Sequence, residues 1–394
     1  MERAFIYGKP VINPHFTNRE KEISQIIYEI MSLKEGQAIN LALLGQRRVG
    51  KTSLINNTII RIDDDKQIIP IFVDCMSMPS IRRLSMYIAE SAKNNYSEKR
   101  DDKEYISRLN QYLKKNLSDI ISKIPDIDLS ITSYISLKLS LQEQQKDEQL
   151  IFEKSLNYLE HLAIQKDVYF VVFVDEFSEI AIRWGDEFVR ALRTLIQQQS
   201  RVMYIFSSSA VTYMNDLVYN SKSPFYRQLK PIYVGPLPIE ETRKFILERF
   251  QVVEHTISDS ALEKMIKITN GLPDYVQRLG DMILETSSNT EIIDEDIEIA
   301  YEEMFITLDA VFNMLFSRLT DNSKVYSDIV VSIAQYERPV QIATDSGVPM
   351  SSLYYYLPYL INTGIIQKIE KGKYSLVDPL FKIWIINKFK LEES

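Results

Sequence analysis

The first half of the chain alternates between short apolar runs and longer segments with helical periodicity. The apolar runs are continuous, as expected for strands of a parallel sheet that is covered on both faces. They span residues 41–44, 68–73, 168–174 and 202–206, and helical patterns at 81–92 and 150–164 lie between them. We therefore predict an α/β core in which right-handed crossovers place helices on both faces of a parallel sheet.

A different pattern precedes the third of these runs. Between Ile127 and Leu139, isoleucine and leucine alternate with polar residues, and Thr132-Ser133-Tyr134 interrupts the alternation. A period of two is typical of strands with one buried face. The pattern predicts a strand pair inserted near residues 126–141, with a hairpin turn at the interruption.

Beyond Pro236 the strand signals stop, and helical patterns follow at 239–250, 258–269 and 274–286. The last part of the chain predicts a separate module, with helices at 328–336, 340–345 and 350–363 and a hairpin of 365–369 with 373–377. Three helices followed by a hairpin form a winged helix-turn-helix. We therefore expect a core over residues 1–236, a helical lid over 237–310 and a winged-helix domain over 311–394.

Composition narrows the class of protein. The 394 residues carry a formal net charge of −8, so any contact with nucleic acid would need a local basic patch. The single cysteine, Cys75, excludes an internal disulfide framework, and the three histidines lack the spacing of metal ligands. The first ten residues lack the apolar core of a signal peptide, and the longest apolar run is far shorter than the roughly 20 residues of a membrane span. We expect a cytoplasmic protein without membrane contact.

The strongest chemical signal follows the first strand. The run Gly45-Gln46-Arg47-Arg48-Val49-Gly50-Lys51-Thr52, with Ser53 after it, fits G-x-x-x-x-G-K-[ST] between a predicted strand and a predicted helix. In such a loop, successive backbone N–H groups surround a phosphate and the helix N-terminus adds positive potential. Lys51 would reach the β- and γ-phosphates of ATP, and the Thr52 hydroxyl would bind Mg²⁺. The alternative is a chance glycine-containing turn between a strand and a helix.

Acidic residues end the third strand, at the edge where open α/β sheets bind ligands. Asp175 would orient Mg²⁺, and Glu176 would polarise the attacking water as general base; two solvated carboxylates are the alternative. Ser209 is the last residue of Ser207-Ser208-Ser209, which follows the next strand. Its side chain could sense the γ-phosphate; the alternative is that it belongs to a polar turn. Arg227 could approach the γ-phosphate from a neighbouring subunit or a mobile lid, although a solvated surface arginine has the same signature.

Taken in order, these motifs resemble the archaeal ATPase family, a branch of the AAA+/STAND P-loop ATPases. Phe16-Thr17-Asn18-Arg19-Glu20 with Glu22 resembles the family's F-x-x-R-E-x-E segment, which implies that Phe16 and Arg19 lie near the adenine. Thr269 to Pro273 resembles the G-x-P motif in the family's lid. The resemblance implies that Pro273 packs beside the nucleotide base. The alternating segment is similar to the family's inserted strand pair.

Two departures from the family pattern fall at groups that would sense the γ-phosphate. The usual Gly-Ser after the sensor strand is Ser208-Ser209 here, and the Pro-Leu-Tyr-Gly-Arg segment is Pro224-Phe225-Tyr226-Arg227-Gln228, with its arginine one place early. The resemblance implies ATP as the nucleotide and slow turnover. Our leading hypothesis is an ATPase that acts with Mg²⁺ as a nucleotide-dependent switch or regulator through the winged helix.

The sequence of the winged-helix segment does not identify what the protein binds. Between Arg338 and Lys368 there is no lysine or arginine, and the candidate reading helix offers Ser351, Ser352 and Tyr354 to Tyr356 instead. Pro358 is expected to kink or shorten that helix. The hairpin lysines make a mildly basic wing, so double-stranded DNA and a protein partner both stay possible, as does an oligomer. The alternatives to a switch are a DNA-dependent ATPase of the origin-recognition or transposition-helper type and a non-hydrolysing nucleotide-binding scaffold.

Overall fold

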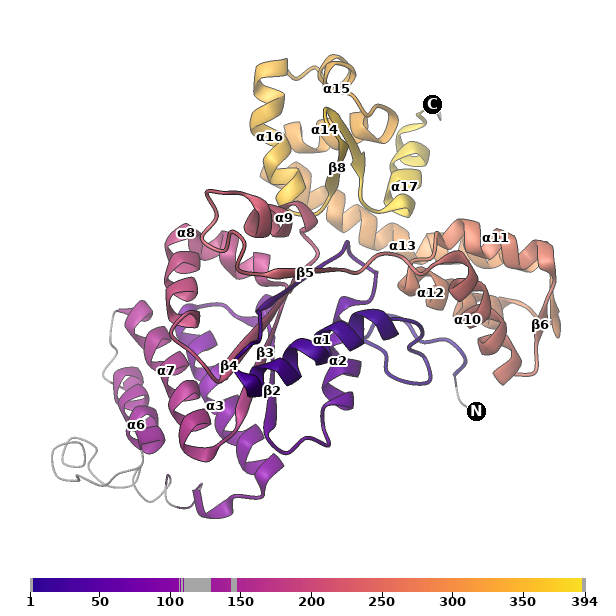
Figure 1. Cartoon of the computed structure of the whole chain (residues 1–394). Coiled ribbons are helices and arrows are strands. Elements are labelled where there is room, and N and C mark those ends of the chain that lie inside the picture. The colour runs from indigo at the N-terminus through magenta and orange to yellow at the C-terminus, as the bar shows by residue number, and fades with distance from the viewer. Residues whose placement is uncertain (1–2, 106, 108, 110–128, 143–146, 392–394) are drawn as a thin grey trace.

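The computed structural model describes residues 3–105, 107, 109, 129–142 and 147–391 (Figure 1). Its first half is built on a five-stranded sheet whose strand pairs are all parallel, in the order β2-β3-β4-β1-β5. The strands are β1 (Leu41–Leu44), β2 (Ile68–Asp74), β3 (Tyr169–Asp175), β4 (Val202–Ser208) and β5 (Lys230–Tyr233). The predicted parallel α/β sheet is confirmed.

Alternate residues of β1 to β4 pack into two hydrophobic clusters, one on each face of the sheet. Leu41 and Leu43 of β1 belong to one cluster, and Ala42 and Leu44 belong to the other. The first face is covered by α1 (Glu20–Ser32) and α2 (Lys51–Arg61). The second is covered by α3 (Ile81–Arg100), α7 (Glu148–Lys166), α8 (Phe177–Ile196) and α9 (Val211–Tyr219), and α6 (Leu129–Gln142) packs on α7. Two short 3₁₀ turns, η1 (Leu33–Glu35) and η2 (Cys75–Ser77), also lie in the described part of this half.

The predicted strand pair near residues 126–141 is wrong, and so is the likeness to the family's inserted strands. Residues 126–128 lie outside the described residues, and the chain from Leu129 to Gln142 is helix α6, packed on α7. Isoleucines that alternate with polar residues also recur at a spacing of four, so Ile131 and Ile135 share one helical face. Tyr134, expected in the turn, completes that buried stripe, with its ring 5.0 Å from that of Tyr158.

The segment after β5 forms a lid of helices. It contains α10 (Ile239–Val252), α11 (Asp259–Thr269), α12 (Pro273–Thr286) and the 29-residue α13 (Asp294–Asn322). The expectation that strands end at Pro236 needs correction, because β6 (Thr256–Ile257) and β7 (Glu291–Ile292) form a parallel pair within the lid. Strands of two residues leave no periodic signal. Helix α13 also runs without interruption through residue 310, the predicted end of the lid.

The C-terminal module, residues 324–389, contains α14 (Lys324–Gln335), α15 (Pro339–Ser346), α16 (Met350–Asn362), β8 (Ile366–Glu370), β9 (Lys373–Leu376) and α17 (Pro379–Phe389). The predicted order of three helices and an antiparallel hairpin is present. Pro358, expected to kink or shorten this helix, does not shorten it, because α16 continues to Asn362. Helix α17 packs on α13, where the Trp384 indole donates a hydrogen bond to Asp309 at 2.7 Å. The module is thereby anchored on the long lid helix.

The C-terminal module also packs on the core. In Figure 1, α16 and β8 lie against α9, and residue contacts join α9 to both elements. At the end of α16, a Cβ added to Gly364 would lie 3.3 Å from the backbone oxygen of Ser209. The module therefore lies against the carboxyl end of β4, the edge of the sheet that carries the motifs. Within the described ranges, no helix has the length and apolar character of a membrane span.

Candidate active site

The phosphate loop joins β1 to α2, and its geometry explains why its glycines are needed. Gly50 precedes α2 with φ of 88°, a left-handed conformation that suits glycine. At Gly45 a side chain would overlap the backbone oxygen of Val234, because the loop passes closely over the end of β5. The sequence therefore builds a tight strand–loop–helix turn with its helix N-terminus at the carboxyl edge of the sheet.

A cavity of about 480 Å³ lies over this loop. Its size falls in the range of small-molecule sites. It is enclosed by the N-terminal segment, the phosphate loop, Glu176 after β3, the start of α12 and the middle of α13, with Leu237 and Phe245 at the entry to the lid. Among the predicted site residues, those that line it are Phe16, Arg19, Arg47, Arg48, Val49, Gly50, Lys51, Thr52, Ser53, Glu176 and Pro273.

Lys51 is buried at the base of this cavity. Its ammonium group donates to the backbone oxygens of Gly45 at 2.7 Å and Gln46 at 3.1 Å. Burial lowers the pKa of this ammonium, and the carboxylates of Glu176 and Asp175 oppose that shift. A phosphate would provide the buried cation with a stronger, charged partner.

Thr52 and Asp175 meet beside the lysine. The Thr52 hydroxyl donates to one carboxylate oxygen of Asp175 at 2.6 Å, and the Ser207 hydroxyl donates to the other. The sheet order explains this, since β4 lies between β1 and β3 and brings Ser207 between the loop and the acid. A hydroxyl and a carboxylate in contact are oxygen ligands of the kind that Mg²⁺ prefers. These residues therefore fit a magnesium ion.

Glu176 is an acidic residue of the cavity lining, and its charge acts on Lys51. It precedes α8 with φ of 50°, so the chain turns sharply after β3. One of its carboxylate oxygens accepts hydrogen bonds from the backbone N–H of Ser209 at 3.0 Å and from the Ser209 hydroxyl at 2.9 Å. Ser209 thus contacts the candidate base, although it does not line the cavity itself.

Arg19 forms hydrogen bonds to the backbone of the phosphate loop and of the segment after β5. Its guanidinium donates to the backbone oxygen of Val49 at 3.1 Å and to that of Gly235, which connects β5 to the lid. It also pairs with Glu22 at 3.2 Å, and burial lowers the pKa of the arginine. The F-x-x-R-E-x-E segment therefore connects the phosphate loop to the root of the lid.

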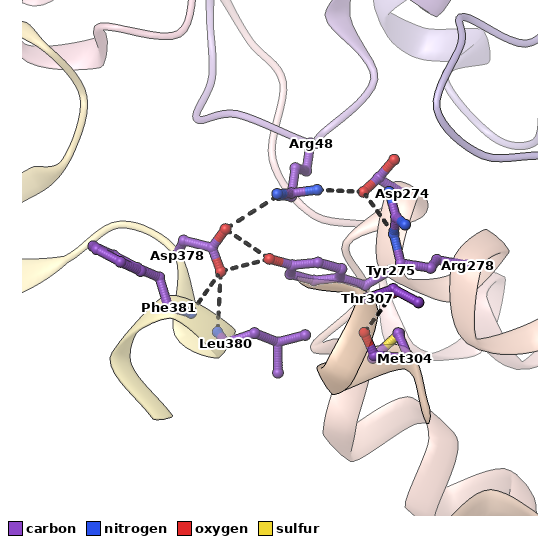
Figure 2. Close-up of polar contacts among 9 residues, drawn as sticks. All are labelled: Arg48, Asp274, Tyr275, Arg278, Met304, Thr307, Asp378, Leu380 and Phe381. Carbon is purple, nitrogen blue, oxygen red and sulfur yellow. Dashed lines mark hydrogen bonds and ion pairs between the residues drawn. The ribbon is translucent and has the colours of Figure 1, made fainter. Parts of the chain in front are cut away.

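Arg48 contacts side chains of the lid and of the C-terminal module (Figure 2). It pairs with Asp274 at 2.6 Å and with Asp378 at 3.1 Å, and lies 4.7 Å from the ring centre of Tyr275. Burial acts to lower the pKa of Arg48, but Tyr275 and the two aspartates outweigh it and raise the pKa. This arginine is held by negative charge from two other parts of the chain.

Five predicted residues do not line the cavity, namely Gly45, Gln46, Asp175, Ser209 and Arg227. Gly45 and Gln46 contribute backbone oxygens to Lys51 but do not line the cavity. Arg227 is exposed between α9 and β5, with its guanidinium 5.1 Å from the ring of Tyr226 and outside the cavity lining. A role for Arg227 across a subunit boundary stays a prediction.

Residues near the N-terminus were not predicted for the site. The segment from Ile6 to Val11 lines the cavity, and the ring of Tyr7 lies 4.3 Å from the Arg278 guanidinium of α12. The segment is held by hydrogen bonds, from the N–H of Val11 to Ser53 at 3.0 Å and from the N–H of Ile6 to Gln277 at 2.9 Å. The sequence pattern that could have indicated this segment is the apolar run Phe5-Ile6-Tyr7, which would anchor the chain, followed by Gly8 and Pro10, which favour a turn.

The comparisons with known proteins agree with this geometry. A family model described as an ATPase domain predominantly from Archaea matches residues 16–279. The chain is similar to the Walker-type ATPase PABY2304 of Pyrococcus abyssi, with a TM-score of 0.67, 18% identity, and coverage of 96% of this chain and 98% of that one. No curated protein matches the sequence at a significant level.

Two further solved structures share the fold. The ORC1 protein of Aeropyrum pernix in complex with DNA aligns with a TM-score of 0.53 and 12% identity, covering 99% of both chains. The ADP form of the ORC2 protein of Aeropyrum pernix aligns with a TM-score of 0.53 and 12% identity, covering 98% of this chain and 97% of that one. At these identities the similarity extends to the fold alone.

Proposed function

Since the chain belongs to the family of ATPase domains found predominantly in archaea and is a P-loop ATPase, we propose that it hydrolyses ATP with Mg²⁺ as a nucleotide-dependent switch. One observation carries the proposal. Lys51, Thr52 and Glu176 line one cavity under the lid, and Asp175 contacts Thr52. A cation for phosphate, ligands for a metal and a base for water are the groups that this reaction needs.

Each group has a defined part in the reaction. The backbone N–H groups of residues 45–52 would hold the phosphates, and Lys51 would balance the charge of the β- and γ-phosphates. Thr52 and Asp175 would hold Mg²⁺, which supplies charge neutralisation on the phosphates when bound. Glu176, oriented by Ser209, would accept the proton of the attacking water.

The first experiment measures steady-state ATP hydrolysis with Mg²⁺ for the unmodified chain and for Glu176→Gln. We expect the variant to bind ATP with unchanged affinity and to lose roughly 100-fold in turnover, the scale of a general base. Glu179→Gln is the matched control, because Glu179 lies in the first turn of α8 and does not line the cavity. Unaltered turnover in Glu176→Gln removes Glu176 from the role of base.

A second variant separates binding from chemistry. Lys51→Ala should abolish nucleotide binding, because it removes the buried ammonium that the loop holds at Gly45. A variant that binds ATP as tightly as the unmodified chain contradicts this site. If the unmodified chain binds ATP but shows no turnover above background, the protein is a non-hydrolysing nucleotide-binding scaffold.

The output of the switch would be the C-terminal module, which we assign as a winged helix from its order of α14, α15, α16 and the β8–β9 hairpin. The solvent face of α16 presents Tyr354 and Tyr355, 53% and 78% exposed. Exposed tyrosines on a helix that carries no lysine or arginine suit a protein interface. We therefore propose a protein partner for this face.

DNA is the second candidate partner. It is supported by the likeness to an origin-recognition protein in complex with DNA and by the lysines of the β8–β9 hairpin. Of these, Lys373 already pairs with Glu370 and Glu337, which reduces the charge available to a phosphate. Duplex DNA added to the hydrolysis assay distinguishes the two. Turnover that DNA accelerates, with an effect that weakens steeply with salt, favours a DNA-dependent ATPase.

A further inference from the structure

One carboxylate connects three parts of the chain that are distant in sequence. Asp378 precedes α17 and accepts hydrogen bonds from the backbone N–H groups of Leu380 at 3.0 Å and Phe381 at 3.2 Å. The Tyr275 hydroxyl of α12 donates to both of its oxygens at 2.6 Å, and Arg48 of the phosphate loop pairs with it at 3.1 Å. Figure 2 shows these contacts converging on Asp378. The loop, the lid and the C-terminal module thus meet at one ion pair.

The ion pair is shielded from solvent and has a second acid beside it. The side chains of Arg48 and Asp378 are each 21% exposed, and that of Asp274 is 23% exposed. Asp274 also lines the cavity over the phosphate loop, and Arg278 approaches it at 3.9 Å. A partly buried cation shared between two aspartates is stable only while both stay close.

The module touches the catalytic edge at a second point. Gly364 lies against the backbone oxygen of Ser209, the residue whose N–H and hydroxyl hold Glu176. The ion pair at Asp378 and the contact at Gly364 therefore hold the same module at the phosphate loop and beside Ser209. Movement of the module would therefore change the contacts of the phosphate loop and of the residue that holds the candidate base at the same time.

Arg48 faces two competing kinds of partner. It lies inside the G-x-x-x-x-G-K-[ST] loop and lines the cavity that the phosphates would enter. Its guanidinium can bind a phosphate as well as a carboxylate, since both accept charge-assisted hydrogen bonds. The phosphates of a nucleoside triphosphate would also repel the carboxylates of Asp274 and Asp378. Docking of the module and occupation by a triphosphate therefore oppose each other.

We propose that Arg48 is the residue through which the nucleotide controls the C-terminal module: a bound triphosphate takes Arg48 from Asp378 and releases the module from the core. This rests on the proposed function of the same site. Because a coupling free energy acts equally in both directions, weakening the docked state must strengthen triphosphate binding by the same factor. That reciprocity makes the proposal testable without knowledge of the partner.

The test compares the affinity of the full chain and of Asp378→Asn for a non-hydrolysable ATP analogue and for ADP, with Mg²⁺ present. Asparagine still accepts the capping hydrogen bonds of α17, so the variant should fold while losing the ion pair. We expect Asp378→Asn to bind the analogue on the order of fivefold more tightly, with a smaller gain for ADP. The control is Glu370→Gln, which removes an ion pair with Lys373 in the same module and should leave both affinities unchanged.

A distance measurement gives a readout that a purely structural role would not move. Spin labels at Lys66→Cys in the core and Tyr355→Cys on α16 report the position of the module, since both positions are exposed. We expect the analogue to change the distance distribution in the otherwise unmodified chain. Asp378→Asn should show that change without nucleotide, whereas Glu370→Gln should not.

The outcomes separate the two proposals. If the unmodified chain does not bind the analogue, the proposed function fails and the role of Arg48 fails with it. If it binds, but Asp378→Asn binds equally or more weakly, only the release mechanism is overturned. Arg48→Gln provides a second check, because it removes the cation from both partners. It should weaken analogue binding and leave the label distance insensitive to nucleotide; a distance that still responds contradicts the proposal.

Discussion

The hydroxyl and the backbone N–H of Ser209 both donate to one carboxylate oxygen of Glu176, at 2.9 and 3.0 Å. The serine comes from the end of β4 and the glutamate from the end of β3, so sheet pairing brings them together. Two residues earlier, the Ser207 hydroxyl donates to Asp175. The two serines therefore orient the two acids that the reaction assigns to water and to metal.

Ser209→Ala should lower turnover by about tenfold without weakening ATP binding. The substitution removes one of two hydrogen bonds that orient Glu176, and a bond to a charged group contributes about 1.5–3 kcal/mol. The matched variant is Ser207→Ala, which should raise the Mg²⁺ concentration needed for half-maximal turnover because it loosens Asp175. Rate measurements across a magnesium titration would reveal the two effects. Identical profiles for the two variants would contradict the division of roles.

Gly364→Ala should destabilise the docking of the C-terminal module. Gly364 has φ of 69°, and its added Cβ would lie 3.3 Å from the backbone oxygen of Ser209. Gly372 provides the control, since it has φ of 75° but nothing within 4 Å of an added Cβ. Alanine at either position costs about 1 kcal/mol for the left-handed backbone, so the difference between the variants reports the contact with Ser209. Thermal unfolding should show the larger loss for Gly364→Ala, and turnover should change in that variant alone.

Acid should weaken the attachment of α6. Glu90 of α3 is partly buried, which acts to raise its pKa, but bonds from Lys138, Lys93 and Tyr134 outweigh burial and lower the pKa to about 2. A lowered pKa stabilises the folded state fully above the ordinary value of 4.5, and the contribution is lost as the pH falls from there toward 2. Urea unfolding should therefore show a gap between the unmodified chain and Glu90→Gln at pH 6 that shrinks by pH 3. A gap that does not change with pH would show that the charge of Glu90 plays no part.

The thiol of Cys75 should be inert in the folded protein. The side chain is fully buried at the end of β2, and burial together with the nearby carboxylates of Asp175 and Asp74 raises its pKa. Since the thiolate is the reactive form, a disulfide reagent at pH 8 should label Cys75 only after denaturant is added. Rapid labelling without denaturant would mean that the sheet opens at this edge.

Much of the fold could be predicted because its signals are local. Continuous apolar runs marked β1 to β4, and the β8–β9 hairpin was found with its turn at Gly372. The prediction of a strand pair near residues 126–141 was wrong because, in a short segment, a period of two and a helical spacing can fit the same residues. The segment is a helix that buries Tyr134 against α7. The strands β6 and β7 were missed because two residues carry no period.

By itself the sequence determined the phosphate loop, the acids that end β3 and the order of the elements, because each of these depends on residues adjacent in the chain. The partners of those residues were decided only by tertiary structure. Nothing near Arg48 in the sequence points to Asp378, 330 positions away, and nothing near Glu176 identifies Ser209 as its hydrogen-bond donor. These contacts depend on strand order and on the docking of the lid and module. The free energy of docking depends on buried area and on charges contributed by many residues that are distant from one another in the sequence. No local sequence pattern contains this information.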